Sequence, residues 1–307
     1  MKNLFNNEYK INKPIRLLEL FAGIGSQAMA LRNIGANFEL YRVIEFDKYA
    51  IKSYNTIHGT NFETSDIRNV RGLDLGIVDC DKFTYILTYS FPCQDLSVAG
   101  LGKGMKKGNG TRSGLLWEVE RLLNETENLP QVLLMENVPQ VHGKKNLADF
   151  NAWMDFLKSK GYQNFWQDLN AKDYGVAQNR KRCFMVSILS KDFINFEFPE
   201  KIELKKVMKD YLEDTVDEKY YINNEKALKL IEQLIVDGGL ENEKKAERNR
   251  GGRLIPASLD RCADGKFVSI NDAKIKDVSK KLSSTLLSRD YKGLNRHGQN
   301  CIIERID

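Results

Sequence analysis

The chain has 307 residues, which by length alone predicts about two domains and a full hydrophobic core. Hydrophobic residues make up 42% and charged residues 29%, ordinary values for a soluble globular protein, and no apolar run approaches the roughly 20 residues of a membrane span. The net charge of +5 is only a mild lean toward a polyanionic partner.

The cysteines and the N-terminal sequence indicate a cytoplasmic setting. Five cysteines are scattered along the chain without a CxxC pair, so we expect reduced thiols, no disulfide framework and no metal site. The first eight residues lack the apolar core of a signal peptide. We therefore expect a cytoplasmic protein with no membrane association.

Strand-like and helix-like segments alternate between residues 15 and 190. The expected strands cover residues 16–21, 38–44, 83–88, 131–135, 162–169 and 183–189, with a further β-like piece before Asp66. The expected helices cover residues 26–33, 47–58, 113–124 and 147–160. This alternation predicts an α/β fold with a doubly wound, mostly parallel sheet.

The composition changes after about residue 190. Residues 191–250 are rich in Lys, Glu, Asp and Asn, with one helix expected at 224–236. Residues 242–253 are charged and then glycine-rich, and short β-like pieces follow from Arg253. A solvated loop is the simplest interpretation of this charged stretch, and contact with a nucleic-acid backbone is the alternative.

A nucleotide-type cofactor site is predicted at the ends of the first strands. Residues 21–26 read Phe-Ala-Gly-Ile-Gly-Ser and link the first strand to a helix, where glycines let the backbone approach a ligand. Glu45 ends the second strand and can accept both ribose hydroxyls, and Asp66 can hold an adenine amino group. An adenosine-containing cofactor is favoured, although Ala28 leaves an NAD-binding pattern open.

A second set of residues carries group-transfer chemistry. Cys93 follows Phe91 and Pro92 after a buried strand, where a nucleophile has rigid support and an open cleft. Glu136 directly follows the apolar run 132–135, so it projects at the same sheet edge. Arg180 and Arg182 share one face of a strand start. A thiol and a carboxylate in one cleft fit covalent group transfer better than hydride transfer.

These motifs resemble the DNA (cytosine-5)-methyltransferase family, and they occur in that family's order. The matching segments are residues 20–25, 91–94 with Ser97, 112–116, 136–138, 178–182 and 284–286. The resemblance covers roughly residues 14–303 and implies a fold typical of S-adenosylmethionine-dependent methyltransferases with a smaller, irregular target-recognition region.

The resemblance also implies a reaction and its residues. Cys93 attacks cytosine C6, Glu136 holds the N3 edge, Arg182 anchors the base and Arg180 positions the loop or the backbone, while the base is flipped out of duplex DNA. The implied S-adenosylmethionine contacts are Phe21, Gly23, Ile24, Gly25, Glu45, Phe46, Asp66, Ile67, Pro92 and Leu115. The implied DNA contacts are Gln94, Ser97, Lys103, Lys106, Lys107, Arg112, Gln178 and Arg253. Residues 99–110 are expected to form a mobile loop that closes over DNA.

The expected domains are a catalytic domain at 1–190, a target-recognition region at 191–280 and a return segment at 281–307. The family's usual C-terminal Gly-Asn-Ser/Ala-Val motif is not found, and three explanations are open: a second polypeptide supplies it, the chain is truncated, or the motif is dispensable here. A missing segment is favoured, and it predicts weak cofactor binding by the isolated chain. A cognate restriction endonuclease is a further expected partner. The alternatives are a DNA-binding remnant without activity, one subunit of a split methyltransferase, an RNA cytosine methyltransferase and, least favoured, a dehydrogenase.

Overall fold

The computed structural model describes residues 9–96, 104–211, 268–269, 274–275 and 283–284. The chain divides into two compact units. The first unit comprises residues 1–169 and 181–199, and the second comprises residues 170–180 and 200–307. The domain boundaries expected from the sequence remain predictions.

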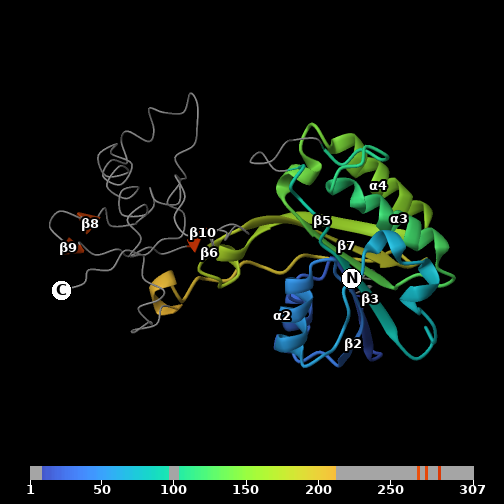
Figure 1. Ribbon diagram of the computed structural model, residues 1–307, viewed down its shortest axis with the longest axis horizontal. Coiled ribbons are helices and arrows are strands. Elements are labelled where there is room, and N and C mark those ends of the chain that lie inside the picture. The colour runs from blue at the N-terminus through green and yellow to red at the C-terminus, as the bar shows by residue number, and fades with distance from the viewer. Residues whose placement is uncertain (1–8, 97–103, 212–267, 270–273, 276–282, 285–307) are drawn as a thin grey trace, which may run out of the picture. The chain divides into compact units, whose positions relative to one another are not determined.

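The first unit is built on a six-stranded sheet in the order β2-β1-β3-β4-β7-β5 (Figure 1). The strands are β1 (Ile15–Leu20), β2 (Phe38–Ile44), β3 (Thr84–Tyr89), β4 (Val132–Asn137), β5 (Tyr162–Asn170) and β7 (Lys181–Leu189). Strand β1 pairs in parallel with β2 and β3, and β3 pairs in parallel with β4. Strand β7 pairs antiparallel with β4. The predicted α/β fold with a mostly parallel sheet is confirmed.

Helices cover both faces of this sheet, because alternate strand residues point to opposite sides. The helices are α1 (Ser26–Asn33), α2 (Lys48–His58), α3 (Leu116–Glu125) and α4 (Leu147–Ser159). Leu18, Leu87 and Met135 share the main core cluster with apolar residues of α3 and α4, whereas Leu17 and Ile86 pack in a second cluster with Ala28 of α1. Figure 1 shows α3 and α4 on one side of the sheet and α2 on the other.

Three differences between the local structure and the sequence expectation concern segments that carry predicted site residues. The β-like piece before Asp66 is not a strand, because the backbone N–H of Ser65 bonds the carbonyl of Glu45 and Asp66 caps the 3₁₀ helix η1 (Ile67–Asn69). The helix expected at 113–124 begins with the 3₁₀ turn η3 (Ser113–Leu115) before α3. Strand β7 starts two residues earlier than expected, which places Arg182 within the sheet.

In the second unit, β6 (Gln178–Asn179) pairs in parallel with β10 (Ser283–Ser284), and β8 (Val268–Ser269) pairs antiparallel with β9 (Lys274–Ile275). The short 3₁₀ helices are η5 (Ala171–Asp173) and η6 (Met208–Tyr211). The helix expected at 224–236 lies outside the described residues. No helix in the described part of the chain is long and apolar enough to cross a membrane.

Candidate active site

The glycine-rich turn after β1 has the tight backbone that its sequence predicts. Phe21, Gly23 and Gly25 all have positive φ angles, of 56°, 56° and 78°. A Cβ atom on Gly25 would lie 2.4 Å from His58 Nε2, so α2 packs directly against this turn. A Cβ atom on Gly23 would meet no atom within 4 Å. The turn therefore has open space at Gly23, where a ligand can approach the backbone.

Glu45 holds this turn at the end of β2. Its Oε2 accepts a hydrogen bond from the backbone N–H of Gly23 at 2.8 Å, and its Oε1 accepts one from the N–H of Asp47 at 2.8 Å. A carboxylate oxygen has two lone pairs, so both oxygens keep acceptor capacity for a pair of hydroxyls. Phe46, the next residue, is 72% exposed. An acceptor pair, an open glycine and an exposed aromatic ring fit a nucleoside.

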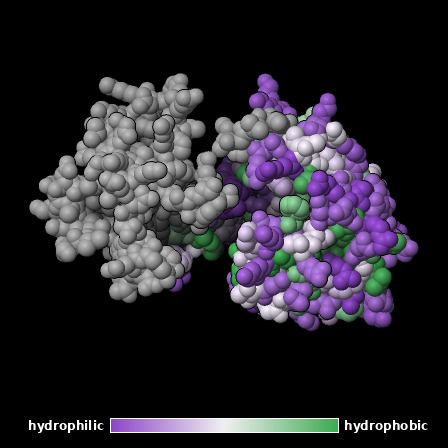
Figure 2. Space-filling view, in the orientation of Figure 1, coloured by the Kyte–Doolittle hydropathy of each residue, from purple (hydrophilic) through white to green (hydrophobic). Residues whose placement is uncertain are grey.

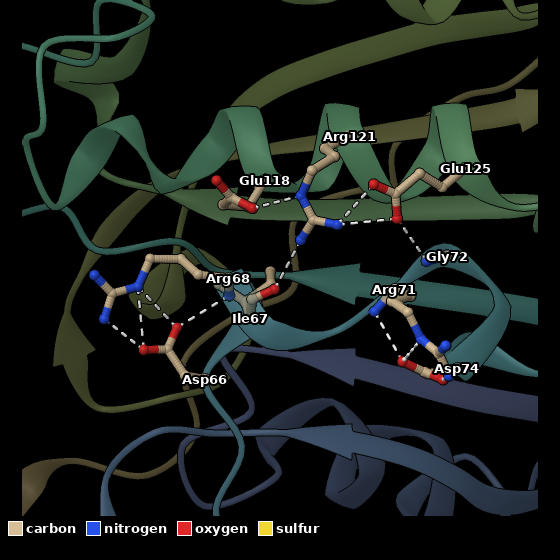
Figure 3. A network of polar contacts seen from close by, with 9 residues as sticks. All are labelled: Asp66, Ile67, Arg68, Arg71, Gly72, Asp74, Glu118, Arg121 and Glu125. Atoms are coloured by element: carbon tan, nitrogen blue, oxygen red, sulfur yellow. Dashed lines mark hydrogen bonds and ion pairs between the residues drawn. The ribbon is translucent and has the colours of Figure 1, made fainter.

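The segment 66–74 is tied to α3 by a polar network (Figure 3). Arg121 bonds Glu118 and Glu125 on its own helix, and its Nη2 donates to the carbonyl of Ile67 at 3.0 Å. Glu125 also accepts from the backbone N–H of Gly72 at 2.8 Å. Arg121 therefore fixes the backbone of Ile67, one of the predicted cofactor contacts.

Asp66, the other predicted contact in this segment, pairs with Arg68 through its side chain. The hydrogen bond from Arg68 is the main cause that lowers the pKa of Asp66, and the carboxylate is therefore ionised near neutral pH. Its side chain is 18% exposed. An adenine amino group would meet a carboxylate that already has one cationic partner.

The loop that carries Cys93 is fixed by polar contacts on both sides. The Asn137 amide donates to the carbonyl of Phe91 at 2.9 Å, and the Ser113 hydroxyl donates to the carbonyl of Pro92 at 2.7 Å. Asp95 accepts from the backbone N–H groups of Arg112 and Ser113. Cys93 is half-buried at the tip of this fixed turn. The Pro92 carbonyl is thereby held by Ser113 of η3, the turn that ends at the predicted contact Leu115.

Glu136 and Arg182 form an ion pair across the β4–β7 ladder. Arg182 Nε lies 3.0 Å from Glu136 Oε1, and the two side chains are 17% and 19% exposed. Since Tyr89 of β3 pairs with Met135 of β4, Glu136 and the loop after β3 leave the sheet at the same edge. The structure thus brings together the predicted carboxylate and one of the two predicted arginines, beside the predicted thiol loop.

Cys183 adjoins this pair but differs from Cys93 in its surroundings. It is fully buried in the main core cluster. Burial, with smaller contributions from the Asp168 and Glu136 carboxylates, raises the pKa of its thiol to about 12. A buried, protonated thiol is a poor nucleophile, so Cys93 is the better candidate for covalent chemistry.

The remaining predicted residues are distributed as follows. Arg180 and Gln178 belong to the second unit, while Ser97, Lys103 and Arg253 lie outside the described residues. Gln94, Lys106 and Arg112 are exposed on the first unit. Lys107 is 63% exposed and pairs with Glu120 at 2.7 Å. The described surface of the first unit is largely hydrophilic in the view of Figure 2.

Sequence reasoning missed four positioning residues: Asp95, Ser113, Arg121 and Asn137. Ser113 lies within the matching segment 112–116 and Asp95 lies between Gln94 and Ser97, but the sequence around them gave no sign that both side chains are buried. Asn137 directly follows Glu136 in the motif 136–138, so its place in the motif was the signal. Arg121 gave no signal, because its partner Ile67 is 54 positions away.

Solved structures of two methyltransferases share this fold. A methyltransferase of Entamoeba histolytica, EhMeth, superposes with a TM-score of 0.58 at 20% identity, over 75% of this chain and 67% of that chain. The Dnmt2 methyltransferase of S. pombe superposes with a TM-score of 0.54 at 24% identity, over 71% and 65%. The fold is that of the S-adenosylmethionine-dependent methyltransferases.

Sequence comparison gives the family. The family model for C-5 cytosine-specific DNA methylases matches residues 15–292, and the chain belongs to this family. The orphan methyltransferase M.SssI of Spiroplasma monobiae is 37% identical over 69% of this chain and 68% of its own length. The type II methyltransferase M2.ScrFI of Lactococcus lactis subsp. cremoris is 34% identical over 68% and 71%, and the orphan methyltransferase M.SPRI of Bacillus phage SPR is 30% identical over 94% and 74%. The family and the enzyme class, a DNA (cytosine-5)-methyltransferase, are as the motifs predicted.

Proposed function

We propose that the protein methylates C5 of cytosine in double-stranded DNA through a covalent adduct on Cys93. The observation that carries the proposal is the Glu136–Arg182 ion pair at the sheet edge where the Cys93 loop is fixed. A nucleophile, a carboxylate and a guanidinium at one edge match the needs of an aromatic base that is too electron-poor to attack a methyl donor unaided.

Cys93 supplies the covalent step. Its thiolate attacks cytosine C6 to form a C–S bond, and the electron pair of the C5–C6 double bond makes C5 nucleophilic. After C5 receives the methyl group, a base removes the C5 proton and the thiolate leaves by β-elimination, which restores the double bond. The hydrogen bonds from Asn137 and Ser113 to the flanking carbonyls hold the Cys93 loop for this attack.

Glu136 and Arg182 stabilise the ring during this step. Glu136 contacts N3 and the exocyclic amine, where charge develops as the C–S bond forms. Arg182 contacts O2 and is kept in place by its ion pair with Glu136. Both side chains are largely shielded from water, so their interactions with the base are stronger than at an exposed surface. Arg180 of the second unit is proposed to contact the loop or the DNA backbone.

S-adenosylmethionine, when bound, supplies the methyl group. Glu45 is proposed to accept the ribose hydroxyls, Phe46 to lie against the adenine, and the turn at Gly23 to approach the ligand backbone. The open space at Gly23, the two fixed oxygens of Glu45 and the exposed ring of Phe46 support this assignment. Asp66 and Ile67 would border the adenine, and Pro92 and Leu115 would border the methyl donor.

DNA reaches the site from the surface that carries the exposed basic residues. Lys106 and Arg112 are exposed, and the backbone N–H of Arg112 bonds Asp95 of the Cys93 loop; both side chains are proposed to contact phosphates. The target base is proposed to be flipped from the duplex, at a cost of a few kcal/mol, because C6 is inaccessible inside the stack. A cognate restriction endonuclease is proposed as a partner in the cell, since relatives such as M2.ScrFI are named type II methyltransferases.

The experiment is sequencing of genomic DNA from cells that express the full chain, by a method that reports 5-methylcytosine. The proposal predicts methylation at one short recurring sequence, and none in cells that express Cys93→Ser. Matched expression of the two proteins is checked by immunoblot. Absence of methylated cytosine from the DNA of wild-type cells, or an equal signal with Cys93→Ser, would contradict it.

A further inference from the structure

Three side chains outside the proposed reaction bring metal-ligand atoms together. They are His142 at the end of the 3₁₀ helix η4 (Pro139–His142), Asp168 of β5 and Cys183 of β7. One ligand atom from each lies within 4.8 Å of the other two, and His142 Nε2 is 2.9 Å from Asp168 Oδ1. Among the described residues, this is the one group of three or more His, Cys, Asp or Glu side chains whose ligand atoms lie this close together.

The donor set suits Zn²⁺. An imidazole nitrogen, a carboxylate oxygen and a thiolate sulfur are its usual protein ligands, and sites with three protein ligands complete the tetrahedron with water. Bonds of about 2.0 to 2.3 Å place the ligand atoms of a tetrahedral ion about 3.3 to 3.8 Å apart. The His142–Asp168 contact therefore has to open by about half an ångström, and the Cys183 sulfur has to move inward by at most about 1.5 Å.

The surroundings of the three ligands favour this arrangement. The His142 ring packs against Trp166, with 4.7 Å between ring centroids and a tilt of 37° between the planes, and lies 6.1 Å from the Phe150 ring, so its orientation is restricted on two sides. Lys181 pairs with Asp168 Oδ2 at 3.2 Å, but its side chain is 59% exposed and can turn to solvent when a cation enters. The His142 and Asp168 side chains are 23% and 18% exposed, which gives an ion access from one side while Cys183 closes the other.

We propose that His142, Asp168 and Cys183 bind one Zn²⁺ ion, with water as the fourth ligand. The ion would link η4, β5 and β7 next to the paired strands β4 and β7, which carry Glu136 and Arg182. Cys183 is opposite Asn137 in the β4–β7 ladder and adjacent to Arg182, and Asn137 holds the Phe91 carbonyl. The site therefore stabilises the part of the sheet that supports Glu136 and the Cys93 loop.

This site runs against the sequence expectation of no metal. The three ligands are separated by 26 and 15 positions (142 to 168, and 168 to 183), and no CxxC pair occurs. Only the antiparallel return of β7 beside β4 brings Cys183 to the end of η4.

The test uses the full chain after removal of metal by a chelator and dialysis, with Co²⁺ as the spectroscopic probe. One equivalent of Co²⁺ is expected to produce a thiolate-to-cobalt absorption band in the near ultraviolet together with intense tetrahedral bands in the visible, and Zn²⁺ is expected to displace both. Cys183→Val should abolish the thiolate band. Cys80→Val is the matched control, because Cys80 is a half-buried free cysteine elsewhere in the core, and it should keep the band.

Two further measurements keep the test valid if Cys183→Val does not fold. His142→Gln changes a partly exposed side chain and should weaken Co²⁺ binding by about tenfold or more while circular dichroism stays that of the wild type. Zn²⁺ at 100 times its dissociation constant should raise the melting temperature of the wild-type chain by about 5 °C, and not that of His142→Gln. Absence of a thiolate band in the wild type, or a band that persists in Cys183→Val, would overturn the proposal.

Discussion

Replacing Arg121 by Met tests whether α3 positions the cofactor site. The Arg121 guanidinium donates to the carbonyl of Ile67 at 3.0 Å and pairs with Glu118 and Glu125 at 2.8 and 2.9 Å. Met keeps a long, unbranched side chain but removes every donor. The Ile67 carbonyl then loses its charged partner, and the backbone between Asp66 and Gly72 is held by fewer bonds to the helix (Figure 3).

The expected magnitude follows from these contacts. A hydrogen bond from a charged group contributes about 1.5 to 3 kcal/mol, and a partly exposed ion pair contributes about 0.2 to 1 kcal/mol. Arg121 is 32% exposed, so the lower half of the first range applies and the two ion pairs add little. We expect a loss of about 2 kcal/mol in the free energy of unfolding. We also expect the Kd for S-adenosylmethionine to rise about tenfold, which corresponds to about 1.4 kcal/mol.

Urea unfolding measures the stability, and calorimetric titration measures the cofactor affinity. Arg71→Met is the matched control, because Arg71 forms a similar pair with Asp74 at 2.8 Å but is 75% exposed and does not contact the predicted site. It should leave the Kd for S-adenosylmethionine within twofold of the wild-type value, because the Arg71–Asp74 pair lies away from the predicted site. Arg121→Lys, which keeps one cationic donor, should restore part of the affinity. Cofactor binding by Arg121→Met within twofold of the wild type would refute this role.

Two further predictions concern the turn and the acid behaviour of the first unit. Gly25→Ala should lower the free energy of unfolding by more than about 2 kcal/mol, because the φ of 78° strains any L side chain and the Cβ would lie 2.4 Å from His58 Nε2. Gly35→Ala is the control, since Gly35 has a φ of 69° but no atom within 4 Å of an added Cβ. It should cost only about 1 kcal/mol in the same urea unfolding assay. Equal costs would contradict this packing. Asp74 should titrate by NMR with a pKa of about 2, because Arg71 hydrogen-bonds its carboxylate, and this pKa should return toward about 4 in Arg71→Gln. A folded-state pKa below the unfolded value stabilises above the unfolded pKa, so its contribution is lost as the pH falls from about 4 to 2. An unchanged Asp74 pKa in Arg71→Gln would contradict the assigned cause.

Local sequence patterns were sufficient to predict most elements of the catalytic unit. The apolar runs before Cys93 and Glu136 are strands β3 and β4, since runs of this length match a buried strand and are too short for a typical buried helix. The glycines at 23 and 25 marked a turn whose positive φ angles the structure contains. The motifs in their order were also enough to predict the family.

Contacts between distant positions were not predictable in this way. Periodicity does not reveal strand direction, so the antiparallel pairing of β7 with β4, which brings Arg182 to Glu136, came only from the structure. Arg121 reaches Ile67 across the interface of a helix and a loop, and a single sequence carries no signal for such a pair. The stretch before Asp66 has β-like composition, but capping by Asp66 and the bond from Ser65 to Glu45 compete with strand pairing there.

Capture of a covalent adduct tests the central claim most directly. Duplex DNA is synthesised with 5-fluorocytosine in place of every cytosine, so that the unknown target sequence does not matter. Fluorine at C5 leaves no proton to remove, and the β-elimination that releases Cys93 cannot occur. In the presence of S-adenosylmethionine, the full chain is expected to form a protein–DNA adduct that survives denaturation and maps by mass spectrometry to the peptide with Cys93. An adduct on another residue, or one that still forms with Cys93→Ser, would contradict the account.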